Sequence, residues 1–130
     1  MAESNLVIVG VNHKTTPVEI REQLAFTRGK IEDSIEKLVS FPEIIENIII
    51  STCNRVEIYA RVTDIEKGIH LLKRFVCDYH GLSLEDLNEH FYCYRNQETI
   101  EHLFRVSSSL DSMVLGESQI LGQMKQAYQL

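Results

Sequence analysis

The chain has 130 residues, of which 44% are hydrophobic and 25% are charged, and its formal net charge is −6. These values fit one globular domain with its own core, and they argue against a generic nucleic-acid binder because an acidic chain has no overall basic field, although a few Arg or Lys contacts to one RNA stay open. No signal peptide or bilayer-length apolar run is visible, and three cysteines without metal-like spacing indicate reduced thiols in a cytoplasmic protein.

The first part of the chain predicts one strand followed by two helices. The continuous apolar run at residues 6–11 is typical of a buried strand. Pro17 is expected to open a helix that reaches about residue 25, with Thr16 as its N-cap. A second helix is expected over residues 29–40. Its predicted apolar face consists of Ile31, Ile35, Leu38 and Val39.

A hairpin is predicted in the middle of the chain. Residues 47–53 form the first strand, and three consecutive isoleucines at 48–50 indicate that it is covered on both faces. Residues 56–62 alternate between apolar side chains and Glu57, Tyr59 and Arg61, which is typical of a second strand. Only two residues separate these runs, and that is hairpin spacing.

The remaining elements complete a recognisable order. Asp64 is expected to cap a helix that ends near Gly81, residues 90–95 to form a strand, Asn96 to cap the next helix, and a last helix to run from about Met113. The core order βαββαβ predicts an α+β fold with a ferredoxin-like antiparallel sheet and extra helices. In such a sheet the first two strands run in the same direction, so their carboxyl ends share one edge.

Cys53 is the residue best placed for chemistry. It is expected to end a buried strand and enter a tight turn, where positive charge from Arg55 or His13 would favour its thiolate. Thr52 and Asn54, together with local backbone N–H groups, could hold a developing oxyanion. From the residues alone, the alternative of a small buried hydrophobic side chain stays open.

The other candidates are more ambiguous. Cys77 and Cys93 are predicted to be structural, and His13 is either a solvated loop residue or a functional one. His102 points away from the apolar stripe of its helix, which predicts either an exposed histidine or a cleft residue that binds substrate or transfers protons. Residues 112–123 fit either an amphipathic helix end or a ligand-contacting segment. No glycine-rich phosphate loop or Cys/His cluster indicates a nucleotide or metal site.

Three segments carry a specific combination of motifs in a fixed order. They are residues 10–18 (GVNHKTTPV), residues 51–59 (STCNRVEIY), and residues 102–106 (HLFRV) leading into 110–123 (LDSMVLGESQILGQ). Together they resemble the N-terminal catalytic domain of the glutamyl-tRNA reductase family, over nearly the whole chain. Two small departures are Ser109, where the family often has Gly, and Ser118, where it often has Pro.

The resemblance implies a thioester mechanism. Cys53 would attack the ester that joins glutamate to tRNA(Glu), and NADPH would then reduce the thioester to glutamate-1-semialdehyde, the first step of tetrapyrrole (porphyrin) biosynthesis. His102 matches a histidine important for activity, either as a proton donor or as a substrate anchor. The positions that match substrate-contacting residues are Thr52, Asn54, Arg55, Ser112, Glu117, Ser118, Gln119 and Gln123.

The resemblance also implies how the chain is organised. Residues 1–110 would form the catalytic glutamyl-tRNA-binding domain, and residues 111–130 a substrate-contacting segment and the start of a connecting helix. The family continues into an NADPH-binding domain and a helical dimerisation domain, so we expect a fragment whose NADPH is bound by a domain absent from this chain. Expected partners are glutamyl-tRNA(Glu), a second copy in a full-length homodimer, and a possible contact with glutamate-1-semialdehyde aminomutase, with no membrane.

Two rival hypotheses come from other classes of protein. A non-catalytic RNA-binding module on the same fold predicts basic and aromatic residues on an open sheet face. A small-molecule regulatory domain would have no need for Cys53.

Overall fold

Five strands form one sheet in the computed structural model, which describes residues 5–107 and 114–115. The sheet order is β4-β1-β3-β2-β5, and every neighbouring pair is antiparallel. The strands are β1 (Asn5–Asn12), β2 (Ile44–Ser51), β3 (Arg55–Val62), β4 (Tyr92–Arg95) and β5 (Val114–Leu115).

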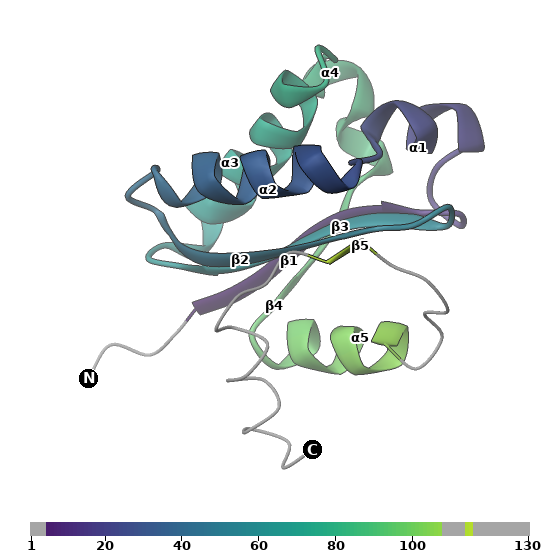
Figure 1. Ribbon diagram of the computed structural model, residues 1–130. Helices are drawn as coiled ribbons and strands as arrows, with labels where there is room; N and C mark the ends of the chain where they lie inside the picture. Colours follow the sequence, from purple (N-terminus) through teal and green to yellow (C-terminus); the bar gives the residue numbers. More distant parts are fainter. Residues whose placement is uncertain (1–4, 108–113, 116–130) are drawn as a thin grey trace.

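Helices cover both faces of this sheet (Figure 1). Those on one face are α1 (Val18–Leu24), α2 (Arg28–Val39), α3 (Ile65–Tyr79) and the short α4 (Leu84–Leu87), which a 3₁₀ turn at Asn88–His90 follows. On the opposite face lies α5 (Gln97–Ser107). The predicted mixture of an antiparallel sheet with helices is therefore confirmed.

The covered faces give the protein two apolar cores. The larger core lies between the sheet and α1–α4, and the smaller one, which contains Ile8, Tyr59 and Leu103, lies between the sheet and α5. The consecutive Ile48, Ile49 and Ile50 of β2 alternate between the two cores and are each at most 1% exposed. The strand is therefore covered on both faces, as predicted. Full burial of each such side chain contributes about 1.5–3 kcal/mol to stability.

Two predicted helix signals are confirmed in detail. The Asp64 carboxylate accepts a hydrogen bond from the Lys67 backbone N–H at 3.0 Å and caps α3. At the other end Gly81 has a φ of 70°, a left-handed conformation that glycine adopts without strain.

Two predicted cap side chains do not bond to their helices. Pro17 itself is the N-cap of α1, whereas Thr16 is buried and its hydroxyl lies 2.9 Å from that of Thr15. Asn96 directly precedes α5, and its backbone carbonyl accepts the Ile100 N–H at 3.2 Å, but its side chain accepts the Leu6 N–H at 3.0 Å and so joins the helix start to β1. The Thr16 hydroxyl also donates to the His90 carbonyl oxygen at 3.4 Å. In both cases the side chain thus bonds to a group that is distant in sequence, which local capping rules do not consider.

Several element boundaries also differ from the prediction. The fourth strand begins at Tyr92 because the preceding residues form the 3₁₀ turn, and Val39 at the end of α2 is 48% exposed instead of lying on its apolar face. The strand that was expected to reach Cys53 ends at Ser51. Val114 and Leu115 pair with β2 as a strand, although a helix was predicted there.

The sheet brings the predicted edge together. Because β1 and β2 are both antiparallel to β3, they run in the same direction and their carboxyl ends meet the amino end of β3. Asn12 lies opposite Arg55, and Ser51 lies opposite Val56. The prediction that the carboxyl ends of these two strands share one edge is confirmed.

Replacing Asp64 by Ala tests the α3 cap. Loss of a capping carboxylate is expected to lower the free energy of unfolding by about 1 kcal/mol, measured by urea denaturation. Thr63→Ala, at the exposed neighbouring position, is the matched control and is expected to change stability little. Equal midpoints for the two variants would contradict the assigned cap.

Candidate active site

Cys53 lies at the tip of a three-residue turn that hydrogen bonds hold closely. The Thr52 N–H donates to the Arg55 carbonyl at 2.8 Å, and the Thr52 hydroxyl oxygen accepts the N–H groups of Asn54 and Arg55, both at 3.2 Å. Below the turn, the buried Ser51 hydroxyl accepts the Phe26 N–H at 2.9 Å. The turn is thus fixed within itself and anchored to the segment between α1 and α2.

The structure distinguishes Cys53 from the other two cysteines. Cys53 is exposed, whereas Cys77 is fully buried in the larger core and Cys93 is half-buried beside it. Burial, followed by the nearby Asp78 charge, raises the pKa of Cys77. The alternative of Cys53 as a small buried hydrophobic residue is therefore wrong, and so is its expected position at the end of a strand.

The turn also limits which groups can stabilise an oxyanion. The N–H groups of Asn54 and Arg55 already donate to the Thr52 hydroxyl oxygen. The Cys53 N–H, by contrast, has no hydrogen-bond acceptor among residues 5–107. Among these three backbone N–H groups, the N–H of Cys53 is therefore the one available to an oxyanion.

A buried carboxylate stands two residues beyond Arg55. Glu57 on β3 is 0% exposed, and four donors surround it. Arg55 Nη1 lies 3.2 Å and His102 Nε2 2.6 Å from Glu57 Oε2, and the Tyr92 hydroxyl donates to the same oxygen. The Tyr59 hydroxyl donates to Oε1 at 2.8 Å. We call Arg55, Glu57, Tyr59, Tyr92 and His102 the Glu57 cluster.

These contacts shift the pKa values of the acidic side chains in the cluster. Burial by itself would raise the pKa of Glu57, but hydrogen bonds from His102, Tyr92 and Tyr59 and attraction to His102 outweigh burial and lower it below 4.5. Burial, followed by the charge of Glu57, raises the pKa of Tyr59 and Tyr92. Glu57 is therefore an anion at neutral pH, and both tyrosines are donors.

His102 does not lie where an exposed helix histidine would. It is 8% exposed, and its ring lies 4.9 Å from the Tyr94 ring and 5.6 Å from the Tyr92 ring, centroid to centroid. Of the two predicted possibilities, exposure on the outer face of α5 is wrong. His102 is connected to the cysteine turn through Glu57 and Arg55.

Other predicted positions contribute less or lie outside the described ranges. His13 is exposed in a turn that the Asn12 side chain closes by accepting the Lys14 N–H at 2.9 Å. Asn54 is exposed beside Cys53. The predicted substrate-contacting positions outside the described residues are Ser112, Glu117, Ser118, Gln119 and Gln123.

Sequence reasoning assigned no role to Glu57, Tyr59 or Tyr92. One signal was present, because Glu57 and Tyr59 alternate with apolar residues on a strand beside one that was predicted to be covered on both faces. When both faces of a hairpin are covered, a carboxylate on either face is buried and needs hydrogen-bond or charged partners. The identity of its partners on β4 and α5 was not contained in that local pattern.

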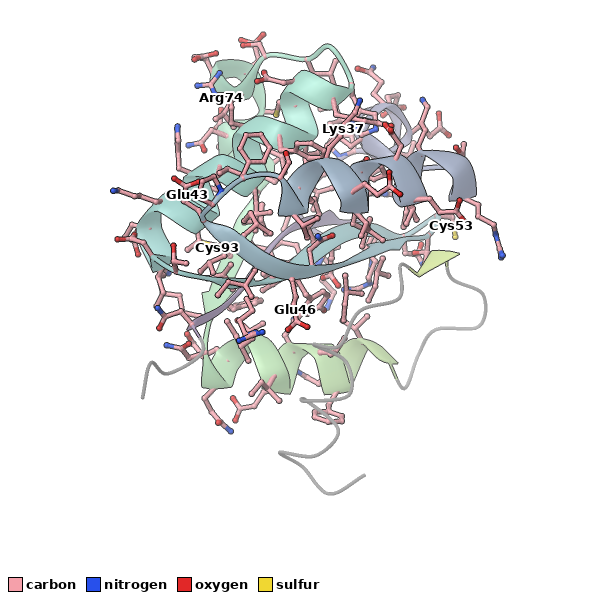
Figure 2. The ribbon with its side chains drawn as sticks, turned by 60° about the vertical axis from the view of Figure 1, so that its left-hand side comes forward. Lys37, Glu43, Glu46, Cys53, Arg74 and Cys93 are labelled. Atoms are coloured by element: carbon pink, nitrogen blue, oxygen red, sulfur yellow. The ribbon has the colours of Figure 1, made fainter. Side chains whose placement is uncertain are left out.

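A surface groove of about 590 Å³ lies elsewhere on the molecule, along α3. Its lining includes Glu43, which Figure 2 shows near the end of the sheet opposite Cys53, and Arg74, which lies among the helices above the sheet in that view. None of the predicted site residues lines it. Within the described ranges there is no group of three His, Cys, Asp or Glu side chains suited to a metal ion, and no helix long and apolar enough to span a membrane.

Known proteins of similar sequence identify the family of this chain. The sequence model for "Glutamyl-tRNAGlu reductase, N-terminal domain" matches residues 9–130. Glutamyl-tRNA reductases of Geotalea uraniireducens (strain Rf4) and Pelobacter propionicus (strain DSM 2379 / NBRC 103807 / OttBd1) are 55% and 53% identical over 124 residues. Each alignment covers 95% of this chain and 29% or 28% of the relative, respectively.

The fold agrees with the same family. The solved structure of glutamyl-tRNA reductase from Methanopyrus kandleri matches with a TM-score of 0.59 and 31% identity, covering 98% of this chain and 28% of that one. The chain belongs to the family of glutamyl-tRNA reductase N-terminal domains. It spans less than a third of the length of the relatives it matches.

Thr52→Val tests whether the hydroxyl oxygen builds the cysteine turn. Removing an acceptor of two backbone N–H groups is expected to destabilise the protein by about 1–2 kcal/mol and to change the alkylation rate of Cys53. Thr52→Ser keeps the acceptor and is the matched control. If Val and Ser variants had the same stability and alkylation rate, the turn would not depend on this oxygen.

Glu57→Gln tests the ionisation of the buried carboxylate. Because the pKa of Glu57 is lowered by folding, its contribution to stability is fully present above its usual value of 4.5 and is lost as pH falls through the folded-state value. The stability advantage of the wild type over the variant should therefore shrink on acidification below that pH, as measured by urea denaturation. Parallel stability–pH curves for the two proteins would contradict the assignment.

Proposed function

We propose that this chain accepts the glutamyl group of glutamyl-tRNA(Glu) on Cys53 as a thioester, within an NADPH-dependent reductase that produces glutamate-1-semialdehyde for tetrapyrrole biosynthesis. The observation that carries the proposal is the exposed Cys53 on a hydrogen-bonded turn, two residues from an arginine that a buried glutamate holds. Membership of the family supports the substrate and the pathway.

The proposed first step is an acyl transfer. The Cys53 thiolate attacks the ester carbonyl, a carbon–sulfur bond forms, and the carbon–oxygen bond to the ribose breaks. The tRNA leaves as the ribose hydroxyl after taking up a proton. A thiolate is the strongest nucleophile among ordinary side chains, which suits this exchange of an ester for a thioester.

Arg55 is suited to select the glutamyl group. Its side chain is 14% exposed, and Nη1 lies against Glu57. A guanidinium has five N–H donors in a planar fork, so the others are available for a substrate carboxylate, with which arginine forms paired hydrogen bonds. Thr52 and Asn54 belong to the same proposed binding site, with His102 as either a proton-transfer group or an anchor.

We propose that the NADPH of this reaction is bound outside the described residues, and the packing of two glycines supports this. Gly10 and Gly68 are closely packed, because an added Cβ would lie 2.8 Å from Glu57 Cγ and 2.7 Å from Val62 Cγ1, respectively. Neither glycine forms a loop that could hold a pyrophosphate. We therefore assign no NADPH contact to this chain. In the proposed reaction, NADPH is bound by a separate cofactor domain of a longer protein.

The same proposal includes the finer organisation predicted above. We interpret β4-β1-β3-β2 as a ferredoxin-like sheet, with a catalytic domain at residues 1–110 and a substrate-contacting segment at 111–130. For the longer protein we propose a cytoplasmic homodimer that contacts glutamate-1-semialdehyde aminomutase. None of these assignments enters the chemistry proposed at Cys53.

The two rival functions fit the structure less well. An RNA-binding module needs aromatic side chains on an open sheet face, but α5 covers this face and Tyr92 and Tyr94 pack beside His102. A regulatory domain for a small ligand gives no reason for a rigid turn that presents an exposed cysteine.

Mass spectrometry after incubation with glutamyl-tRNA(Glu) tests the acyl transfer. We expect a hydroxylamine-sensitive glutamyl adduct on Cys53 in the wild type and in Cys93→Ser, the matched control with a half-buried thiol removed. Cys53→Ser should lack that adduct because its hydroxyl is a much weaker nucleophile. No adduct in the wild type, with Cys53→Ser behaving identically, would remove the proposed function.

Reduction provides a separate prediction. The 130-residue chain supplied with glutamyl-tRNA(Glu) and NADPH should form or hydrolyse the acyl adduct without oxidising NADPH. The measurement is absorbance of NADPH together with assay of the semialdehyde. Coupled NADPH oxidation and semialdehyde release by this chain alone would contradict the assignment of the cofactor to another domain.

A further inference from the structure

The Glu57 cluster contains more donors than a stabilising ion pair needs. An ionised carboxylate accepts about four hydrogen bonds and donates none. Glu57 receives four, three of them at Oε2 from Arg55, Tyr92 and His102. Protonating Glu57 would place a hydrogen among groups that all donate, so this side chain is suited to act as a fixed anion and not as a proton donor.

Space for this carboxylate depends on Gly10. Gly10 on β1 lies opposite both Glu57 on β3 and Tyr92 on β4. A Cβ at position 10 would lie 2.8 Å from Glu57 Cγ, 2.9 Å from the Val56 carbonyl oxygen and 3.2 Å from the Tyr92 hydroxyl. The missing side chain therefore leaves the volume in which the carboxylate meets its donors.

The geometry determines which nitrogen of His102 carries a hydrogen. Nε2 lies 2.6 Å from an oxygen that can only accept, so Nε2 is protonated whether the ring is neutral or cationic. In the neutral ring Nδ1 then holds the lone pair. Nδ1 has no hydrogen-bond partner among residues 5–107, and Tyr92 and Tyr94 restrict the rotation of the ring.

We propose that Glu57 is the positioning residue of this site, and that it commits His102 to act on the substrate through Nδ1. The inference rests on the proposed acyl transfer and states which atom of His102 serves it. When Nδ1 accepts a proton, the ring becomes an imidazolium whose Nε2–H still faces the Glu57 carboxylate. The new positive charge therefore forms beside the buried Glu57 carboxylate.

The same carboxylate also orients Arg55. Glu57 Oε2 is bonded to both Arg55 Nη1 and His102 Nε2. One oxygen thus sets the relative position of the proposed carboxylate-binding group and the proposed proton acceptor. A change at Glu57 is expected to disturb both, whereas a change at Glu46, which is paired with Arg61 on the same sheet, should disturb neither.

Nuclear magnetic resonance of the unaltered protein tests the tautomer directly. Long-range ¹H–¹⁵N correlation on the labelled 130-residue chain separates its five histidines, and His102→Gln identifies the signals of interest. At a pH where the ring is neutral, we expect Nε2 to be the protonated nitrogen and Nδ1 the unprotonated one. A neutral His102 with its hydrogen on Nδ1 would overturn the proposal without any activity measurement.

Glu57→Gln then tests whether Glu57 is the cause. A side-chain amide can donate to or accept from the ring, so the variant should show a mixture of both His102 tautomers and form the Cys53 thioester about 10²-fold more slowly. Glu46→Gln removes another carboxylate that is paired with an arginine, Arg61 at 2.9 Å, and should preserve both the tautomer and the rate. Unchanged His102 signals in a folded Glu57→Gln protein would overturn the positioning role.

Failure of this inference and failure of the proposed function give different results. If no adduct forms on wild-type Cys53, the acyl-transfer function is wrong, while the ¹⁵N spectrum still decides the tautomer. If the adduct forms but His102 carries its neutral-state hydrogen on Nδ1, the function stands and the positioning by Glu57 is wrong. Circular dichroism of each variant separates either result from unfolding.

Discussion

A single buried carboxylate constrains most of this domain. Removing a charge from water costs several kcal/mol unless hydrogen bonds and opposite charge compensate. For Glu57 the compensating donors come from its own strand β3, from β4 and from α5. Glu57 can therefore stay ionised only when the strands pair as they do and α5 lies in its place.

The constraint extends into the packing of the sheet. Gly10 leaves room for the carboxylate, and the smaller core around Ile8, Tyr59 and Leu103 holds α5 against that face. The larger core on the other face supports the same strands. A polar cluster of this kind is stable only when every member has a partner, so the two apolar cores serve the site by holding its donors in place.

Solvent exposure decreases from Cys53 to Glu57. Cys53 is exposed, Arg55 has a 14% exposed side chain and Glu57 is fully buried. The thiol is thus open to solvent, while the carboxylate that contacts Arg55 is shielded from water. Thr52 contributes by using its hydroxyl oxygen to close the turn, which leaves the Cys53 N–H as the available backbone donor.

Local patterns in the sequence determined the isoleucine strand, the Asp64 cap, the Gly81 helix end and the closeness of Cys53 to Arg55, because each depends on neighbours a few residues away. The family motifs added the candidate roles of Cys53 and His102. Only the tertiary structure decided that His102 meets Glu57, 45 residues away, that Asn96 bonds to β1, and that Val114 and Leu115 pair with β2. Helical periodicity shows which residues share a face but not which polar group across the sheet will satisfy them, and a buried charge takes its partners from whichever elements the fold brings within hydrogen-bonding distance.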